Sequence, residues 1–209
     1  MKKILLRIVI AVVAIGLGYL LSVTIVDVIL MGMAYPRFDG DVSKESYLIE
    51  DGVRIDSQTE FRCSAFSSAY VMRHWGTEAH GDSIYDIMPD KMDNGYVYPK
   101  GIAHFLESNG YDVDYHVGNL AALKNEVAKG HPVIVMIKIQ EDKDWLHYVP
   151  VVGYSPDSVY IAESIPELAN ATAKQYNRSI STEDFKKLWN TSAIKMPLYR
   201  NTFFTISKH

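Results

Sequence analysis

The apolar run near the N-terminus is the feature that most constrains what this chain can fold into. From Ile8 to Val26 the sequence has no charged residue, and apolar residues resume after Asp27 and continue to Ala34. At about 1.5 Å per residue, a helix over this run nearly crosses a hydrocarbon core of roughly 30 Å. Residues 1–35 are therefore predicted to form a membrane anchor, since the run is too long and too apolar for an ordinary core helix of a small domain.

Basic residues precede the apolar run, at Lys2, Lys3 and Arg7. Positive charge is typical of the cytoplasmic end of a transmembrane helix, so the N-terminus is expected inside and the rest of the chain outside. The alternative is a cleaved signal peptide, with the segment 32–34 as a loose small-x-small site, which would give a secreted protein. The apolar run exceeds the usual core of a signal peptide and favours a retained anchor.

The remainder of the chain has the composition of one globular domain. We expect residues 36–48 to form a linker and residues 49–209 a single domain, which is long enough to bury a sizeable core. The formal net charge of the whole chain is −4, although the anchor itself is basic. An acidic exported domain argues against nucleic acid as a partner and against an electrostatic grip on anionic lipid.

Cys63 is the only cysteine, so it cannot form a disulfide within the chain. Polar residues from Ser57 onward lead into a short helical pattern that stops at Gly76. This order places Cys63 at or near a helix N-terminus, where free N–H groups and the helix dipole favour a thiolate. A thiolate is a nucleophile, as in cysteine peptidases. The other interpretation of Cys63 is a small buried apolar residue.

Three β-rich runs follow, at 130–138, 145–154 and 158–164. His147 opens the second run and Glu163 closes the third. If these two runs pair as a hairpin, the two side chains meet at the same edge of the sheet. A carboxylate there would fix the tautomer of the imidazole and stabilise its charged form, as the third member of a catalytic triad does. Without that pairing, both would be ordinary residues at strand ends.

Together these segments resemble the papain-like cysteine peptidases, and most closely the bacteriocin-processing, double-glycine leader peptidase-like family. The similarity is carried by a glutamine before the helix-capping cysteine, by the pattern G-x-P-V-I-V from Gly130, and by H-Y-V-x-V-x-G-Y from His147. It extends over roughly 55–164, most of the chain beyond the anchor.

This resemblance implies an α+β papain-like fold, with the cysteine on an N-terminal helical part and the histidine on an antiparallel sheet. It also implies an extracytoplasmic cysteine peptidase or amide hydrolase with a peptide or amide substrate and no cofactor. Cys63 would be the nucleophile, His147 the base and Glu163 the group that orients it. Gln58, with the backbone N–H of Cys63, would stabilise the oxyanion.

Three positions depart from the family pattern. Ser64 and Ala65 replace the usual Gly-Pro or Gly-Ala, Gln58 lies one residue closer to the cysteine than expected, and Glu163 stands where Asn-Asp-Pro is common. These departures leave open a catalytically weak or inactive papain-like domain that binds a peptide or a cell-envelope component. Acyl or amide transfer on the same residues is a third possibility.

The rest of the chain alternates between helix and strand signals. Helices are expected at 82–88, 99–110, 119–130 and 181–189, and a strand at 112–117. His74 precedes a glycine stop and is interpreted as a helix-end residue. The remaining histidines lack the spacing of a metal site.

Overall fold

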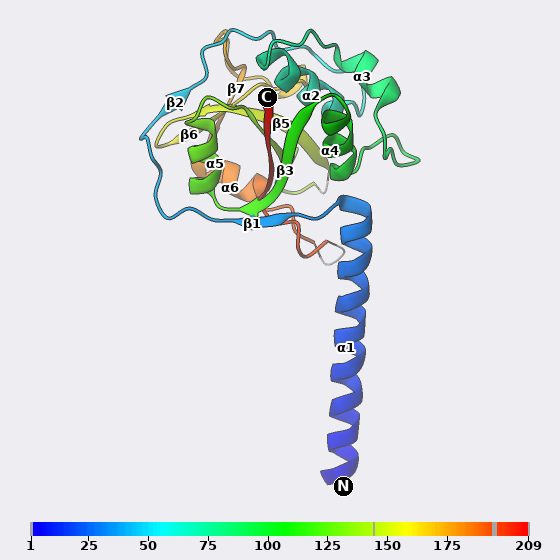
Figure 1. The fold of residues 1–209 in the computed structure, drawn as a ribbon. Coiled ribbons are helices and arrows are strands. Elements are labelled where there is room, and N and C mark those ends of the chain that lie inside the picture. Colours follow the sequence, from blue (N-terminus) through cyan, green and yellow to red (C-terminus); the bar gives the residue numbers. More distant parts are fainter. Residues whose placement is uncertain (1, 144, 194–195, 209) are drawn as a thin grey trace.

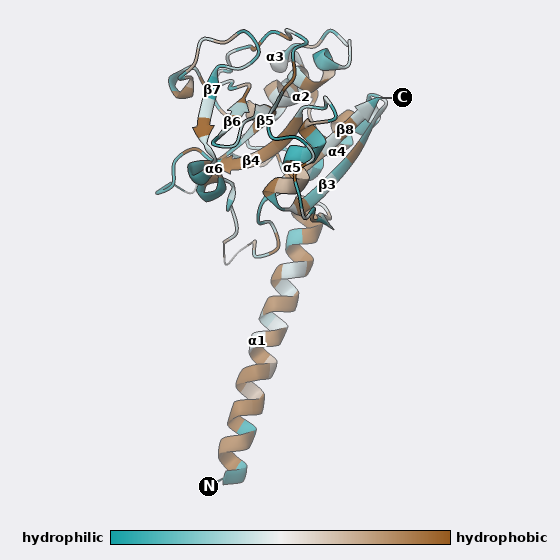
Figure 2. Cartoon of the chain, turned by 90° about the vertical axis from the view of Figure 1, so that its left-hand side faces the viewer, coloured by the Kyte–Doolittle hydropathy of each residue, from teal (hydrophilic) through white to brown (hydrophobic). Residues whose placement is uncertain are grey.

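The computed structural model describes residues 2–143, 145–193 and 196–208, and consists of an α+β domain with one long helix projecting from it (Figure 1). This helix, α1 (Lys2–Met31), has 30 residues and is about 45 Å long. Most of its residues are hydrophobic, as the brown colour along α1 in Figure 2 shows, and their side chains are largely exposed. Among the described residues, α1 is the one helix that is long and apolar enough to cross a membrane.

The last turn of α1 is fixed to the domain by hydrogen bonds to its carbonyl groups. Lys100 Nζ donates to the Ile29 carbonyl at 2.9 Å, and the Tyr199 hydroxyl donates to the Gly32 carbonyl at 2.6 Å. The last carbonyls of a helix have no partner within the helix, so these two side chains satisfy groups that would otherwise be open. The domain is therefore held directly against the end of α1.

One sheet forms the centre of the domain, with the strand order β1-β3-β8-β4-β5-β6-β7 and with β2 paired to β5. The pairings are antiparallel except for that of β1 with β3, so the sheet is mixed rather than purely antiparallel as expected. The strands are β1 (Tyr35–Arg37), β2 (Tyr47–Leu48), β3 (Tyr111–Gly118), β4 (Val133–Lys138), β5 (Leu146–Tyr154), β6 (Ser158–Ile161), β7 (Arg178–Ser181) and β8 (Thr202–Lys208).

Helices cover both faces of this sheet. They are α2 (Cys63–His74), α3 (Gly81–Ile87), α4 (Pro99–Ser108), α5 (Leu120–Val127) and α6 (Thr182–Trp189), with a short 3₁₀ turn, η1 (Pro166–Leu168). Successive side chains of a strand point to opposite faces, so Ile134 packs with α2 and α4 while Val135 packs with α5 and α6. Burial on both faces explains why β4 is a continuous apolar run.

The expected helices and the expected hairpin are confirmed. Asn119 caps α5 by accepting a hydrogen bond from the Ala122 N–H at 3.0 Å, and Gly110 and Gly130 take positive φ angles after α4 and α5. Strands β7 and β8 were not predicted. β8 lies between β3 and β4 although it comes from the far end of the chain, and no local turn signal marks such a pairing.

The segment 36–48, expected to be a linker, also adds to the sheet. Its first residues belong to β1, which pairs with β3, and its last two form β2, which pairs with β5. Between them, Lys44 Nζ donates to the Ala128 carbonyl at 2.9 Å. This segment thus runs from α1 across the domain while remaining bonded to it.

Phe203 and Phe38 provide a matched test of the core. Phe203 on β8 is fully buried, whereas the side chain of Phe38 is 64% exposed. We expect Phe203→Ala to lower the free energy of unfolding by about 3–5 kcal/mol, because it removes apolar contacts and leaves a cavity. Phe38→Ala should change it by no more than about 0.5 kcal/mol. Denaturant titration of the two variants measures the difference, and equal losses would contradict this description of the core.

Candidate active site

Cys63 is the first residue of α2 and is buried. The N–H groups of Ala65 and Phe66 both donate to the Arg62 carbonyl, so they mark the first turn of the helix. The N–H groups that precede them have no acceptor within a helix and carry the positive end of its dipole. The expected position of Cys63 at a helix N-terminus is confirmed, and it favours negative charge on sulfur.

A buried hydrogen bond holds α2 against β5 next to the histidine. Ser67, one turn after Cys63 on the same side of α2, donates from Oγ to the Tyr148 carbonyl at 3.0 Å. Tyr148 follows His147 directly in β5. The side chain of Cys63 is one of the groups that raise the pKa of His147, so the two side chains lie close to each other. The Ser67 bond therefore sets the position of the sulfur relative to the imidazole.

His147 and Glu163 meet as the hairpin of β5 and β6 predicted. Nε2 of His147 lies 2.7 Å from Oε1 of Glu163, and the two side chains are 1% and 0% exposed. The pairing of β5 and β6 continues one residue past β6, where the Ala162 N–H donates to the Pro150 carbonyl. Because Glu163 occupies Nε2, Nδ1 is the imidazole nitrogen that remains for Cys63.

Glu163 is held at every polar atom of its residue. Besides His147, its carboxylate accepts hydrogen bonds from the Ile165 N–H and from Nη1 of Arg178, each at 2.8 Å. Asn177 closes a pair of bonds with its backbone: the Glu163 N–H donates to Oδ1 at 2.7 Å, and Nδ2 donates to the Glu163 carbonyl at 2.8 Å. The longer side chain of glutamate is thus fixed in one position.

Asn177 and Arg178 were missed by the sequence reasoning. In sequence they form part of a glycosylation-like tripeptide on a strand that was not predicted. In the structure, Arg178 on β7 pairs with Ile161 on β6. This pairing brings the guanidinium of Arg178 to Glu163, two residues after Ile161. The one sequence signal was an arginine at the start of a short β pattern. Its partner could not be predicted without knowing that β7 pairs with β6.

The pKa values of His147 and Glu163 are set by burial and by the groups around them. Burial alone would lower the pKa of His147, but the charges and hydrogen bonds of Glu163 and Cys63 outweigh it and raise the pKa to about 9. Burial would raise the pKa of Glu163, yet His147, the Ile165 N–H and Arg178 bring it below its usual value. At neutral pH the structure therefore favours an imidazolium next to the ionised carboxylate of Glu163, with Arg178 as the outer cation.

Gln58 lies beside the strand end that carries Glu163. Its backbone N–H donates to the Ser164 carbonyl at 2.8 Å, and its Oε1 accepts from Ser164 Oγ at 2.6 Å. Its Nε2 donates to the Glu60 carbonyl at 2.6 Å, within a turn where Glu60 has a φ of 53°. An amide NH₂ carries two protons, so one remains for a ligand.

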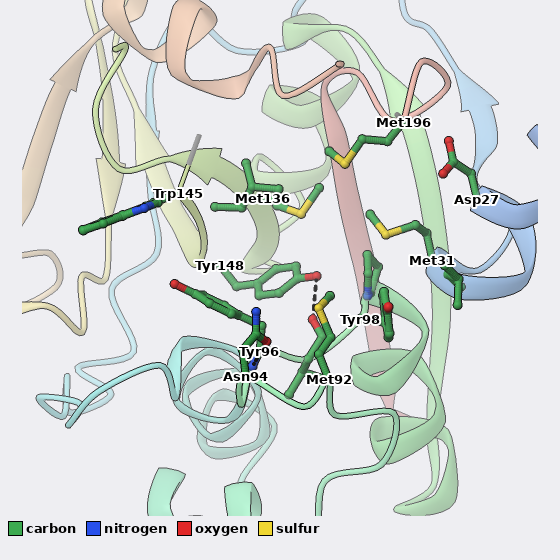
Figure 3. A pocket seen from close by; sticks show the side chains of 14 residues that line it. Asp27, Met31, Met92, Asn94, Tyr96, Tyr98, Met136, Trp145, Tyr148 and Met196 are labelled. Carbon is green, nitrogen blue, oxygen red and sulfur yellow. Dashed lines mark hydrogen bonds between the residues drawn. The ribbon is translucent and has the colours of Figure 1, made fainter. Parts of the chain in front are cut away.

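An open pocket of about 510 Å³ lies beside β5, close to His147 in the chain (Figure 3). Trp145, Leu146 and Tyr148, the neighbours of His147 in the chain, form part of its wall. Aromatic rings continue the wall at Tyr96, whose ring lies 4.8 Å from that of Phe61. The residues on either side of His147 in the chain therefore belong to a largely apolar surface.

The described residues contain no group of three or more His, Cys, Asp or Glu side chains that could hold a metal ion. Other histidines pair with acids elsewhere in the fold: His74 with Asp51, and His104 with Asp90 at 2.7 Å. The site instead combines a cysteine at a helix N-terminus, an imidazolium and a buried carboxylate. Such a set suits attack of sulfur on a carbonyl followed by proton transfer to the leaving group.

Solved structures with a similar fold include peptidases. The peptidase domain of Streptococcus ComA, a bi-functional ABC transporter, matches with a TM-score of 0.57 and 14% identity, covering 75% of this chain and 99% of that chain. A C39-like peptidase from Bacillus anthracis gives 0.58 and 16%, covering 78% and 98%. A double glycine motif protease from an AMS/PCAT transporter, solved with its leader peptide, gives 0.57 and 14%, covering 80% and 97%.

A search among curated proteins finds no match to this sequence. The family comparison is decisive, because residues 50–194 match the peptidase C39-like family. The matched range contains the cysteine, the histidine and the glutamate, and it covers most of the domain beyond α1. With the fold and this match together, the chain belongs to the peptidase C39-like family of cysteine peptidases.

Proposed function

We propose that this protein is a membrane-anchored cysteine peptidase that cleaves a peptide on the extracytoplasmic side of the membrane. The observation that carries the proposal is the buried line of contacts from Cys63 through His147 and Glu163 to Arg178. Charges alternate along this line, so each ionised group has an opposite neighbour. A purely structural cysteine would have no need of such an arrangement.

In the proposed reaction, the Cys63 thiolate attacks the carbonyl carbon of the scissile peptide bond. The oxyanion that forms accepts hydrogen bonds from the Cys63 N–H and from the free amide proton of Gln58. His147 then donates its Nδ1 proton to the leaving amine, which departs and leaves a thioester on Cys63. Neutral His147 next removes a proton from water, and hydroxide attack on the thioester releases the acid and restores the thiolate–imidazolium pair.

Glu163 acts in this scheme through His147 and not on the substrate. It holds Nε2, so that Nδ1 stays directed at Cys63, and its charge stabilises the imidazolium. Arg178 and the Ile165 N–H keep this carboxylate ionised and in place. We infer that glutamate replaces the more common aspartate here because these extra bonds compensate for its additional methylene.

A peptide is the substrate class that the family and the pocket support best. The structure of the double glycine motif protease contains a leader peptide, and the present fold is similar to it. The wall beside His147 is largely apolar and open, as a groove for an extended or helical peptide would be. The sequence that is cut in this protein is not specified by that likeness.

Membrane anchorage is supported by the exposed apolar surface of α1. In our proposal residues 1–35 span the membrane with the N-terminus in the cytoplasm, 36–48 connect, and 49–209 form the peptidase domain outside. The basic residues before the apolar run give this orientation. Cleavage after the segment 32–34 would instead give a secreted peptidase with the same active site.

One observation favours a second candidate, a domain that binds a peptide without cutting it. Both polar atoms of the Gln58 side chain already have partners in the domain, at Glu60 and Ser164. If that amide never turned toward a substrate, the oxyanion would keep only the N–H groups of α2. Removing one such donor costs about 10²- to 10³-fold in rate, which would leave a weak enzyme.

Thiol labelling separates the two candidates, because the chain has a single cysteine. We expect iodoacetamide to label Cys63 rapidly at about pH 6, well below the pKa of about 8.5 of a free thiol. His147→Ala should slow this labelling, since it removes the cation beside sulfur. Glu163→Gln should slow it less, since that side chain acts through His147. The rate is read by intact mass against pH.

The contrary result is labelling that rises only above about pH 8 and that His147→Ala leaves unchanged.

The same cysteine also reports on the orientation of the domain relative to the membrane. A small charged thiosulfonate that cannot cross membranes should modify Cys63 in intact cells if the domain is outside, and only after lysis if it is inside.

The pH dependence of cleavage should report on His147. For a peptide that the protein cleaves, kcat/KM should fall on the alkaline side near pH 9, where the imidazolium loses the proton that the leaving group needs. Since the carboxylate of Glu163 raises the pKa of His147, Glu163→Gln should move this alkaline limb to lower pH, by about 1–3 units.

Glu126→Gln is the matched control for this shift. Glu126 is also a buried carboxylate, but its partners are Arg37, Lys129 and His131 instead of His147. The alkaline limb of kcat/KM in the Glu126→Gln variant should lie at the same pH as in the unmodified protein. An unshifted limb in Glu163→Gln, or an equal shift in both variants, would contradict the proposed role of Glu163.

A further inference from the structure

Asp27 is a buried acid on the anchor helix that the proposed reaction does not use. It follows the apolar run of α1 directly and is only 7% exposed, because the domain packs against this turn. Its Oδ2 has no hydrogen-bond partner in the part of the chain that the structure describes. A buried carboxylate oxygen without a partner is costly, and an acid within an apolar helix that spans a membrane commonly has a function.

This carboxylate lies in the wall of the same pocket that Leu146 and Tyr148, the residues on either side of His147, also line. Figure 3 shows Asp27 on the side of the pocket near Met31 and Met196, with Trp145 and Tyr96 across from it. The ring of Tyr96 lies 4.8 Å from that of Phe61, two residues before Cys63, so this end of the pocket lies near the start of α2. The pocket therefore extends from the chain neighbours of His147 to the end of α1.

The walls between these two ends are apolar. They include the side chains of Met31, Met136, Leu146 and Met196, and methionine adapts its shape to varied ligands. Among the described residues that line the pocket, Asp27 is the one with a formal charge. The ligand that suits such a space has an apolar stem and a cationic tip.

We propose that this pocket receives a lysine or arginine side chain of the substrate and that Asp27 binds its cationic tip. This inference rests on the proposed peptidase function and names its specificity. The stem of a long basic side chain packs along methionine and leucine, and its charged end reaches Oδ2 of Asp27. An acidic side chain would be repelled, and an apolar one would leave the carboxylate unpaired.

The amine of a lipid headgroup has similar chemistry, and the end of α1 would lie near the membrane surface. The position of the pocket favours the peptide, because its other end is formed by the chain neighbours of His147. A side chain that enters from that end belongs to a chain lying across Cys63. The anchor helix thus contributes a specificity residue to the active site in addition to its attachment role.

The test scans a single lysine through the positions around the cleaved bond of a peptide, with norleucine as the apolar counterpart at each position. The full chain in detergent micelles is the enzyme. At one position, lysine should exceed norleucine by about 10- to 100-fold in kcat/KM, mainly through a lower KM, because the ion pair forms in the bound ground state as well. Asp27→Asn should abolish this preference.

Asp93→Asn is the matched control. Asp93 lies between two residues that line the pocket, Met92 and Asn94, but it is exposed and is not part of the wall. Its removal changes the net charge by the same amount, and the preference for lysine should persist. The comparison of lysine with norleucine in the unmodified protein decides the question even if Asp27→Asn does not fold.

A binding assay separates this inference from the proposed function. In a Cys63→Ala variant, which cannot cut, fluorescence anisotropy should show the lysine peptide binding more tightly than the norleucine peptide, and adding Asp27→Asn should remove the difference. A preference in binding without any cleavage by the unmodified protein would support the pocket and refute the peptidase. Equal values for both peptides at every position, a preference that survives Asp27→Asn, or a dependence on phosphatidylethanolamine in place of lysine would overturn the inference.

Discussion

The buried hydrogen bond between His147 and Glu163 is the interaction on which the rest of this site depends. Two ionised groups are taken out of water there, and burial of either one alone would be strongly unfavourable. The arrangement is stable because the carboxylate of Glu163 lies between two opposite charges, the imidazolium of His147 and the guanidinium of Arg178. The same bond occupies Nε2 and leaves Nδ1 for the thiol. One contact thus determines protonation, orientation and nucleophilicity together.

The sequence predicted those parts of this arrangement that depend on local signals. A helix that starts at Cys63, and a hairpin that brings His147 to Glu163, both follow from short-range patterns of turn residues and apolar residues. Arg178 could not be found in this way, because its place depends on the pairing of β7 with β6 after a long connection. β8 was missed for the same reason, since its partners β3 and β4 are distant in sequence. Long-range pairing is set by the packing of the whole sheet and leaves little local trace.

The end of α1 shows how closely the apolar helix and the domain are joined. Lys100 and Tyr199 satisfy the open carbonyls of the helix, and the domain buries Asp27 and Met31. From sequence, Asp27 was only an interruption of an apolar run. The structure adds that the domain buries Asp27 and that one pocket is lined both by Asp27 and by the residues on either side of His147. A helix first interpreted as an attachment thereby becomes part of the wall that a substrate would meet.

The ionisation of His147 is the most direct test of this account. Nuclear magnetic resonance of a protein with ¹⁵N-labelled histidine, recorded over a range of pH with His147→Gln to assign the signal, measures it without any substrate. The account predicts an imidazolium with both nitrogens protonated at pH 7, which titrates only near pH 9. A neutral imidazole at pH 7, with a pKa at or below about 6.5, would contradict it, because burial would then have outweighed the two negative neighbours.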